Sequence, residues 1–377
     1  MKSTFHPTQS ASRRFHTSPG ELEPPSSGVC QLYKRRLIYL GGPDAAKFLQ
    51  GLITNNVDPD DHKSFYSAFL DARGRVLWDV FIWRPSNSDQ DRKHWSCYIE
   101  VDSEESGALL SHLRRHKLRS KVELRLESEK TLSVWAAWGG KVNEDQYHDE
   151  HVVASLVDPR LLDPKPVLRR MLVKGEGRPV SDVSAGSENE YDLLRYTYGI
   201  PEGPNEILKG TALPMECNID LSQGIDFKKG CYVGQELTIR TKHTGVVRKR
   251  ILPVQLYYPD SPPNEKSQIP VFNPEWAVSN DMPEIGADIK QLDEQGAIKK
   301  GRAAGKLIAR IGNVGLSLSR LEMMTSMKVS AEGGSWKPGM EFGMQEENSA
   351  VVKVKPFVRD HFRLLERNMW DKNRTKI

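Results

Sequence analysis

The residues best suited to chemistry lie together in one short segment, residues 229–236. This segment contains, in order, Lys229, Gly230, Cys231, Tyr232, Val233, Gly234, Gln235 and Glu236. The Cys231 thiol lies between two glycines and close to the cations Lys228, Lys229 and, further on, Arg240. Nearby positive charge favours the thiolate, which attacks electrophiles or binds metals, and glycines permit tight backbone turns. The pattern indicates a reactive cysteine on an exposed loop, with a buried apolar cysteine as the alternative.

The other cysteines show no pattern of their own. Cys30, Cys97 and Cys217 are scattered, and no two of the four cysteines form a Cys-x-x-Cys pair. This spacing does not suit a disulfide framework and indicates a reducing compartment with free thiols. A closed tetrahedral metal site needs four ligands at suitable spacing. If the chain handles a metal, we therefore expect another molecule to supply some of the ligands.

The amino-terminal stretch has the composition of a targeting signal. The first twenty residues contain no Asp or Glu, but they contain Lys2, Arg13 and Arg14 among many serines and threonines. This composition is typical of a mitochondrial transit peptide, and residues 21–28 resemble a linker rich in proline and serine. We expect residues 1–28 to be transit peptide and linker, with a disordered basic tail as the alternative, and the mature protein to lie in the mitochondrial matrix.

Bulk composition excludes several classes of protein. The chain has 377 residues and a formal net charge of +4, which is too small to indicate a nucleic-acid partner by itself. Basic clusters at 114–119 and 248–250 are most simply solvated surface. No apolar run is long enough to predict a membrane span.

The pattern of hydrophobic residues predicts the helices and strands that must position Cys231. Apolar residues at helical spacing predict helices over 45–53, from 103 to 113 and over 191–198, whereas β-prone runs occupy 65–70, 76–83, 95–101 and 131–138. After residue 244 short β-prone runs predominate. We therefore predict an α+β region over residues 29–244, a β-barrel over 245–358 and a charged, loose tail over 359–377.

The segment around Cys231 resembles the signature of the YgfZ family, which includes mitochondrial factors that help to mature [4Fe-4S] proteins. Further similarities to that family occur in the same order along residues 29–358. They are Gly42-x-Asp44-Ala45, residues 48–55, Leu70-Asp71-x-x-Gly74-Arg75, Arg195, residues 199–203, Leu213-Pro214-x-Glu216 and Gly315-Leu316-x-Leu318-x-Arg320.

The resemblance implies a three-part ring with a central pocket, the fold of the glycine-cleavage aminomethyltransferases. It also implies a second domain inserted into the first at about residues 65–130. In those transferases the pocket holds tetrahydrofolate, and Glu216 falls where a glutamate contacts the pterin. Arg240 falls on the same side, and Arg195 is a further candidate that suits a salt bridge better than a ligand.

Two features separate a transferase from a cluster-handling protein. The transferases resembled have an acidic pair in the second strand of the first hairpin, where this chain has Trp78-Asp79. Those transferases also lack the cysteine that this chain has as Cys231. We therefore expect Cys231 to be one ligand of a [2Fe-2S] cluster shared in a heterodimer with an A-type iron–sulfur scaffold protein, the partner that the resemblance implies.

Two alternatives remain open at this point. The first is a tetrahydrofolate-dependent one-carbon transferase that uses Asp79 and Glu216. The second is RNA binding by the basic cluster 114–119, although that cluster lacks the interleaved aromatic residues usual in RNA-binding surfaces.

Overall fold

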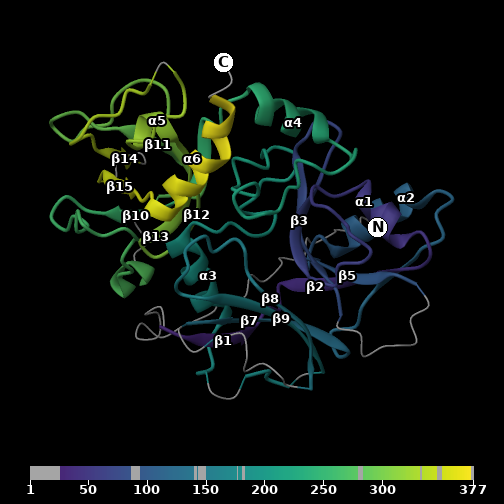
Figure 1. Cartoon of the computed structure of the whole chain (residues 1–377). Helices are drawn as coiled ribbons and strands as arrows, with labels where there is room; N and C mark the ends of the chain where they lie inside the picture. The colour runs from purple at the N-terminus through teal and green to yellow at the C-terminus, as the bar shows by residue number, and fades with distance from the viewer. Residues whose placement is uncertain are drawn as a thin grey trace, which may run out of the picture.

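A computed structural model describes residues 26–85, 94–139, 142, 150–175, 177–180, 183–278, 283–331, 333–345 and 350–374. Nearly all of the expected transit peptide and linker therefore lies outside the described residues. The described part contains three β-sheets, one of them a closed barrel, arranged around a common centre (Figure 1). The α+β class and the carboxy-terminal barrel expected from the sequence are confirmed.

The first sheet has the strand order β3-β4-β5-β2-β6. Its strands are β2 (Arg35–Gly41), β3 (Phe65–Leu70), β4 (Val76–Trp83), β5 (Ser96–Asp102) and β6 (Glu123–Leu126). Helices α1 (Ala45–Gln50) and α2 (Ser106–Lys117) bury Leu49, Leu109 and Leu113 with apolar strand residues in one core. Because β2 pairs with both β5 and β6, residues 65–126 share a sheet with residues 35–41. The insert expected at about 65–130 therefore does not have a sheet of its own.

The second sheet has the strand order β1-β7-β9-β8. Its strands are β1 (Gly28–Gln31), β7 (Leu132–Trp138), β8 (Val152–Val157) and β9 (Leu168–Lys174), and α3 (Glu188–Tyr198) contacts β1. Helix α3 begins with a capping box, in which the Ser187 side chain accepts a hydrogen bond from the Glu190 backbone and the Glu190 side chain accepts one from Ser187.

The third sheet is a closed barrel in the order β10-β13-β12-β11-β14-β15. It comprises β10 (Lys249–Tyr257), β11 (Asp288–Gln291), β12 (Gly305–Ile311), β13 (Val314–Arg320), β14 (Phe342–Met344) and β15 (Val352–Pro356), with the short helices η2 (Pro274–Val278) and α5 (Leu321–Met324). The expected loose tail forms helix α6 (Asp360–Arg374) instead. Its Phe362 is buried with Leu221 and Leu252, and this apolar contact anchors the charged segment.

The centre of the molecule is one apolar core to which all three sheets contribute. Phe81 of the first sheet, Val134 of the second and Leu316 of the barrel belong to it. The segment between α3 and β10 also lines this core and ends in helix α4 (Gln235–Thr244), at the top of Figure 1. In the described residues, no helix has the length and apolar character needed to cross a bilayer.

Candidate functional site

Cys231 is the accessible thiol of the chain. All four cysteines lie in described segments and are free, but Cys30, Cys97 and Cys217 are buried whereas Cys231 is exposed. Burial raises the pKa of each of the three buried thiols, which disfavours the reactive thiolate. Of the two possibilities that the sequence left open for Cys231, the exposed loop is the one found in the structure.

Lys229 attaches the loop to the interior of the molecule. Its ammonium donates hydrogen bonds to the backbone carbonyls of Gln50, Ile53 and Asn55, at 2.8, 2.7 and 2.7 Å. Three acceptors match the three protons of a lysine ammonium. Burial lowers the pKa of Lys229 to about 8, despite the opposing effect of Asp226. Lys229 therefore turns inward and fixes the loop to the segment that follows α1, rather than lying exposed beside the thiol as the sequence suggested.

The residues after Cys231 continue this inward attachment. Tyr232 is buried, its ring lies 4.9 Å from the Lys229 ammonium, and its N–H donates to the Gln235 side chain at 3.3 Å. The Val233 N–H donates to the Gly51 carbonyl at 3.1 Å. The backbone on both sides of Cys231 is thus fixed, and the thiol is left pointing outward.

The two glycines of the segment have different surroundings. Gly234 has a φ of +79°, and a Cβ at this position would lie 2.2 Å from the Asp71 carbonyl oxygen and 2.8 Å from Leu70 Cβ. The fold itself therefore requires glycine at 234, because the β3–β4 turn packs directly against it. A Cβ on Gly230 would meet nothing within 4 Å. Packing within the chain does not explain glycine at position 230, next to Cys231.

Helix α4 begins directly after the loop and carries the last residues of the motif. Glu236 and Arg240 are exposed and lie one turn apart, so they share a face of this helix. Lys228 is also exposed, and its N–H donates to the Asp226 carboxylate at 2.7 Å. These charged side chains, together with Cys231 and Gly230, form the outer surface of the site.

The other site residues expected from the sequence lie away from this surface. Arg195 is buried in ion pairs with Asp192 and Glu206, at 2.6 and 2.7 Å, so it has the structural role that the sequence favoured. Glu216 is buried, pairs with Lys249 at 2.7 Å and accepts the Leu213 N–H at 3.2 Å.

Asp79 is buried beside a network of charges that sequence reasoning missed. The central ion network consists of Arg35, Glu100, Asp158, Arg160, Arg170 and Glu202. Asp79 accepts the Gly203 N–H at 3.1 Å and lies 3.9 Å from Arg35. The sequence signal was Glu100, a glutamate between the apolar residues Ile99 and Val101 of β5.

The charges of the central ion network compensate one another. Arg170 pairs with both Glu100 and Glu202, and Arg160 pairs with Glu202 at 2.8 Å. Burial alone would raise the pKa of Glu202, but Arg170 and Arg160, together with Arg35 and Arg195, outweigh burial and hold that pKa well below its ordinary value. The network connects the first sheet, the second sheet and the segment after α3.

Sequence comparison identifies relatives that cover nearly the whole chain. A protein of Phaeosphaeria nodorum named "Iron-sulfur cluster assembly factor IBA57 homolog, mitochondrial" is 46% identical, with 97% of this chain and 88% of the relative covered. The chain belongs to this IBA57 family. Proteins of the same name from Aspergillus fumigatus and Neurospora crassa are 38% and 41% identical, cover 92% and 88% of this chain, and are themselves covered to 85% and 80%. Like the IBA57 relatives, the chain is mitochondrial.

Two further comparisons agree with the fold of this IBA57 chain. Residues 248–340 match the family described as "CAF17, C-terminal beta-barrel domain". The crystal structure of the glycine cleavage system aminomethyltransferase T from Bartonella henselae superposes with a TM-score of 0.57, covering 89% of this chain and 86% of that one at 12% identity. The ring fold expected from the sequence is confirmed, and at this identity the likeness concerns the fold alone.

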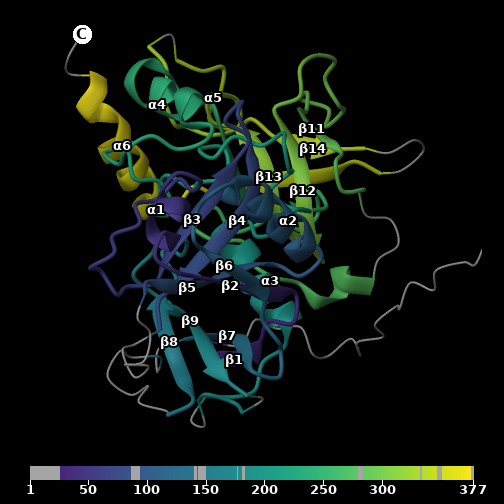
Figure 2. The ribbon, with the colours of Figure 1, turned by 90° about the vertical axis from the view of Figure 1, so that its right-hand side faces the viewer.

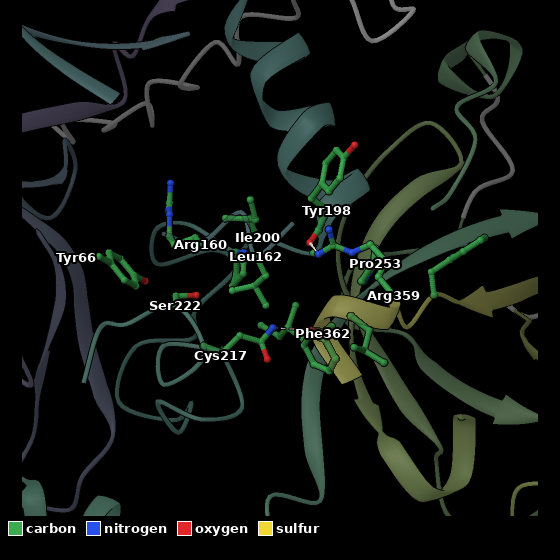
Figure 3. Close-up of a pocket in the computed structure, with 16 residues that line it drawn as sticks. Tyr66, Arg160, Leu162, Tyr198, Ile200, Cys217, Ser222, Pro253, Arg359 and Phe362 are labelled. Carbon is green, nitrogen blue, oxygen red and sulfur yellow. Dashed lines mark hydrogen bonds between the residues drawn. The ribbon is translucent and has the colours of Figure 1, made fainter. Parts of the chain in front are cut away.

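Two hollows lie between the parts of this IBA57 chain, and tetrahydrofolate binding stays a prediction. The larger has a volume of ≈410 Å³, and its lining includes Arg35 of the first sheet, Arg195 of α3 and Ile308 of the barrel. The smaller is the cavity between Tyr66, Arg160 and Cys217, which has a volume of ≈10 Å³, about the space of one water molecule. Figure 3 shows the residues that line this cavity. They include Tyr66 of the first sheet, Cys217 of the segment between α3 and β10, and Phe362 of α6.

Glu216 is held by Lys249, whereas only Oδ1 of Asp79 accepts a hydrogen bond; its buried Oδ2 has no hydrogen-bond partner among the described residues and lies 3.9 Å from Arg35. These contacts define no reaction step through a folate.

Proposed function

We propose that this protein promotes the maturation of [4Fe-4S] proteins in the mitochondrial matrix by sharing a [2Fe-2S] cluster through Cys231. The observation that carries the proposal is the exposed Cys231 thiol on a loop that Lys229 and Tyr232 attach to the interior of the molecule. A thiolate is the ordinary protein ligand of such clusters. The chain thus offers a preorganised ligand on its surface.

The number of ligands that a [2Fe-2S] cluster needs indicates a partner protein. A [2Fe-2S] cluster needs four ligands, and the three remaining cysteines of this chain are buried away from the surface. The other ligands must come from another molecule. An A-type scaffold protein, which brings cysteines of its own, fits this requirement and would form a heterodimer with this chain around the cluster.

The backbone beside the thiol suits this kind of contact. The open space around Gly230 allows a partner and its cluster to approach the loop closely, because no Cβ projects there. The attachment of Lys229 and Tyr232 limits the entropy that the loop loses on binding. The cluster is the cargo of the reaction, and this chain supplies one ligand and a rigid docking loop.

The test is anaerobic gel filtration, with visible absorbance detection, of this protein mixed with an A-type scaffold loaded with a [2Fe-2S] cluster. We expect a coloured heterodimer with the wild-type chain and none with Cys231→Ala. Cys217→Ala, which removes a buried thiol, is the matched control and should still give the coloured heterodimer. A coloured heterodimer with Cys231→Ala, or none with the wild type, would contradict the proposal.

A further inference from the structure

The carboxy-terminal end of α2 carries an unusual combination of charge and exposed apolar surface. We call this region the basic tip. It comprises Arg114, Arg115, Lys117, Leu118, Arg119 and Lys121. Leu118 is 88% exposed, and no acidic residue interrupts residues 114–121. Figure 1 places α2 at the outer edge of the molecule, on the side opposite the barrel, and in Figure 2 this edge faces the viewer.

Leu118 holds a backbone conformation that favours glycine. The Ser120 N–H donates to the Lys117 carbonyl at 2.8 Å, which closes a four-residue turn. Leu118 has φ 44° and ψ −112°, the first central position of a type II′ turn, where glycine is preferred. A leucine here is strained, and its side chain buries nothing within the chain. Neither packing nor turn chemistry explains the residue, so an external contact is the remaining physical reason.

A groove lies beside this turn. It has a volume of ≈430 Å³, and its lining includes Tyr39, His94, Lys117 and Lys121. One acid, Glu123, lines the groove, and a second, Asp44, accepts the N–H of the lining residue Lys121 at 2.7 Å. The five cations of the basic tip outnumber these two acids, so the region attracts an anionic surface.

We propose that the basic tip docks this protein on an anionic phospholipid bilayer. The cations attract the negative headgroups, the groove admits a headgroup phosphate between Lys117 and Lys121, and Leu118 enters the acyl boundary. Stable binding to a membrane surface takes two signals together, and the basic tip offers one apolar and one electrostatic signal.

The exposed Leu118 in the basic tip favours a lipid partner over an RNA partner. An exposed leucine gains by entering hydrocarbon, whereas RNA surfaces present aromatic rings on which bases stack. Residues 114–121 contain no Phe, Tyr or Trp. The proposal is independent of the cluster-sharing function and of Cys231.

The test is flotation of the full chain with vesicles of phosphatidylcholine, with and without cardiolipin. We expect binding only to the vesicles that contain cardiolipin, decreasing as salt is added. Leu118→Gly should lower the bound fraction about fivefold or more while leaving the thermal unfolding midpoint equal or higher, because glycine adopts this backbone without strain.

Charge reversals supply a matched pair of variants. Arg114→Glu/Arg115→Glu/Arg119→Glu should abolish binding, whereas Lys299→Glu/Lys300→Glu/Arg302→Glu, the same three reversals at exposed barrel positions, should keep most of it. Wild type that ignores cardiolipin, Leu118→Gly that binds as wild type, or equal losses in the two triple variants would each overturn the proposal. Binding of a single-stranded RNA through the tip cations, without vesicle binding, would assign the surface to nucleic acid instead.

Discussion

The ammonium nitrogen of Lys229 lies 2.7 Å from the carbonyl oxygen of Asn55, 174 residues earlier in the chain. This contact connects the loop that carries Cys231 to the segment between α1 and β3. Two further carbonyls of the same segment complete the coordination of the ammonium. The position of the thiol thus depends on a partly buried lysine whose ammonium turns away from the surface of the site.

Replacing Lys229 by Met should loosen the loop. Three charge-assisted hydrogen bonds are lost, and we expect the free energy of unfolding to fall by about 1–3 kcal/mol, together with weaker heterodimer formation. Urea unfolding and the gel-filtration assay measure the two effects. Lys228→Met is the control, because Lys228 is exposed and its removal should change stability by less than about 0.5 kcal/mol. Equal behaviour of the two variants would disprove the anchoring role.

Alanine variants of the two glycines of the motif should distinguish the glycine that the fold requires from the glycine that docking requires. Gly234→Ala places a Cβ against the Asp71 carbonyl at positive φ, and should cost about 1–3 kcal/mol of stability or more. Gly230→Ala should leave the unfolding transition within about 0.5 kcal/mol of wild type but reduce the yield of coloured heterodimer. Thermal unfolding and gel filtration on both variants provide the comparison. A Gly230→Ala protein that shares the cluster normally would show that the open space has no role.

Removing a charge from the central ion network should strongly lower the free energy of unfolding. Arg170→Met leaves Glu100 and Glu202 buried without their shared partner, and should cost about 3–5 kcal/mol. Arg73→Met removes an exposed ion pair with Asp71 and should cost at most about 1 kcal/mol. Urea unfolding of both variants measures the loss in the free energy of unfolding. Similar losses would contradict the conclusion that a buried ion pair contributes more to stability than an exposed one.

His112 should make stability depend on pH in the acid range. It packs 5.1 Å from the Trp78 ring, and burial, with smaller effects from His116, Arg115 and Lys209, lowers its pKa to about 4. The unfolded chain takes up this proton near pH 6.5, so the stabilising contribution of neutral His112 is lost as the pH falls from about 6.5 towards 4. His112→Phe should lose less stability than wild type over this interval in parallel thermal unfolding scans. Identical losses would disprove the assignment.

Periodicity and turn chemistry predicted much of the fold. The strands expected at 65–70 and 76–83 match β3 and β4, because the Asp71 turn between them is a local signal. Helix α4 was not predicted, since residues 235–244 have no clear apolar face and the helix depends on its tertiary position. The grouping of β2 with β5 and β6 was also missed, because strand pairing across long sequence separations leaves no local trace.

The candidate site was predicted only in part. The motif identified Cys231 as the reactive residue, but the sequence could not show which neighbouring lysine turns inward and which stays outside. Glu216 and Arg240 were grouped with a pocket by resemblance. In the structure Glu216 is buried against Lys249, while Arg240 is exposed on α4. Side-chain direction in a loop is set by packing, which residue types alone do not encode.

The measurement closest to the central claim is the visible circular dichroism of the purified heterodimer made with Cys231→Ser. This variant replaces a sulfur ligand by oxygen while keeping the size of the side chain. If Cys231 binds the cluster, the charge-transfer bands of the complex should shift or disappear relative to wild type, and the unfolding transition of the isolated chain should stay the same. A cluster spectrum identical to that of the wild-type complex would show that Cys231 is not a ligand and would contradict the account.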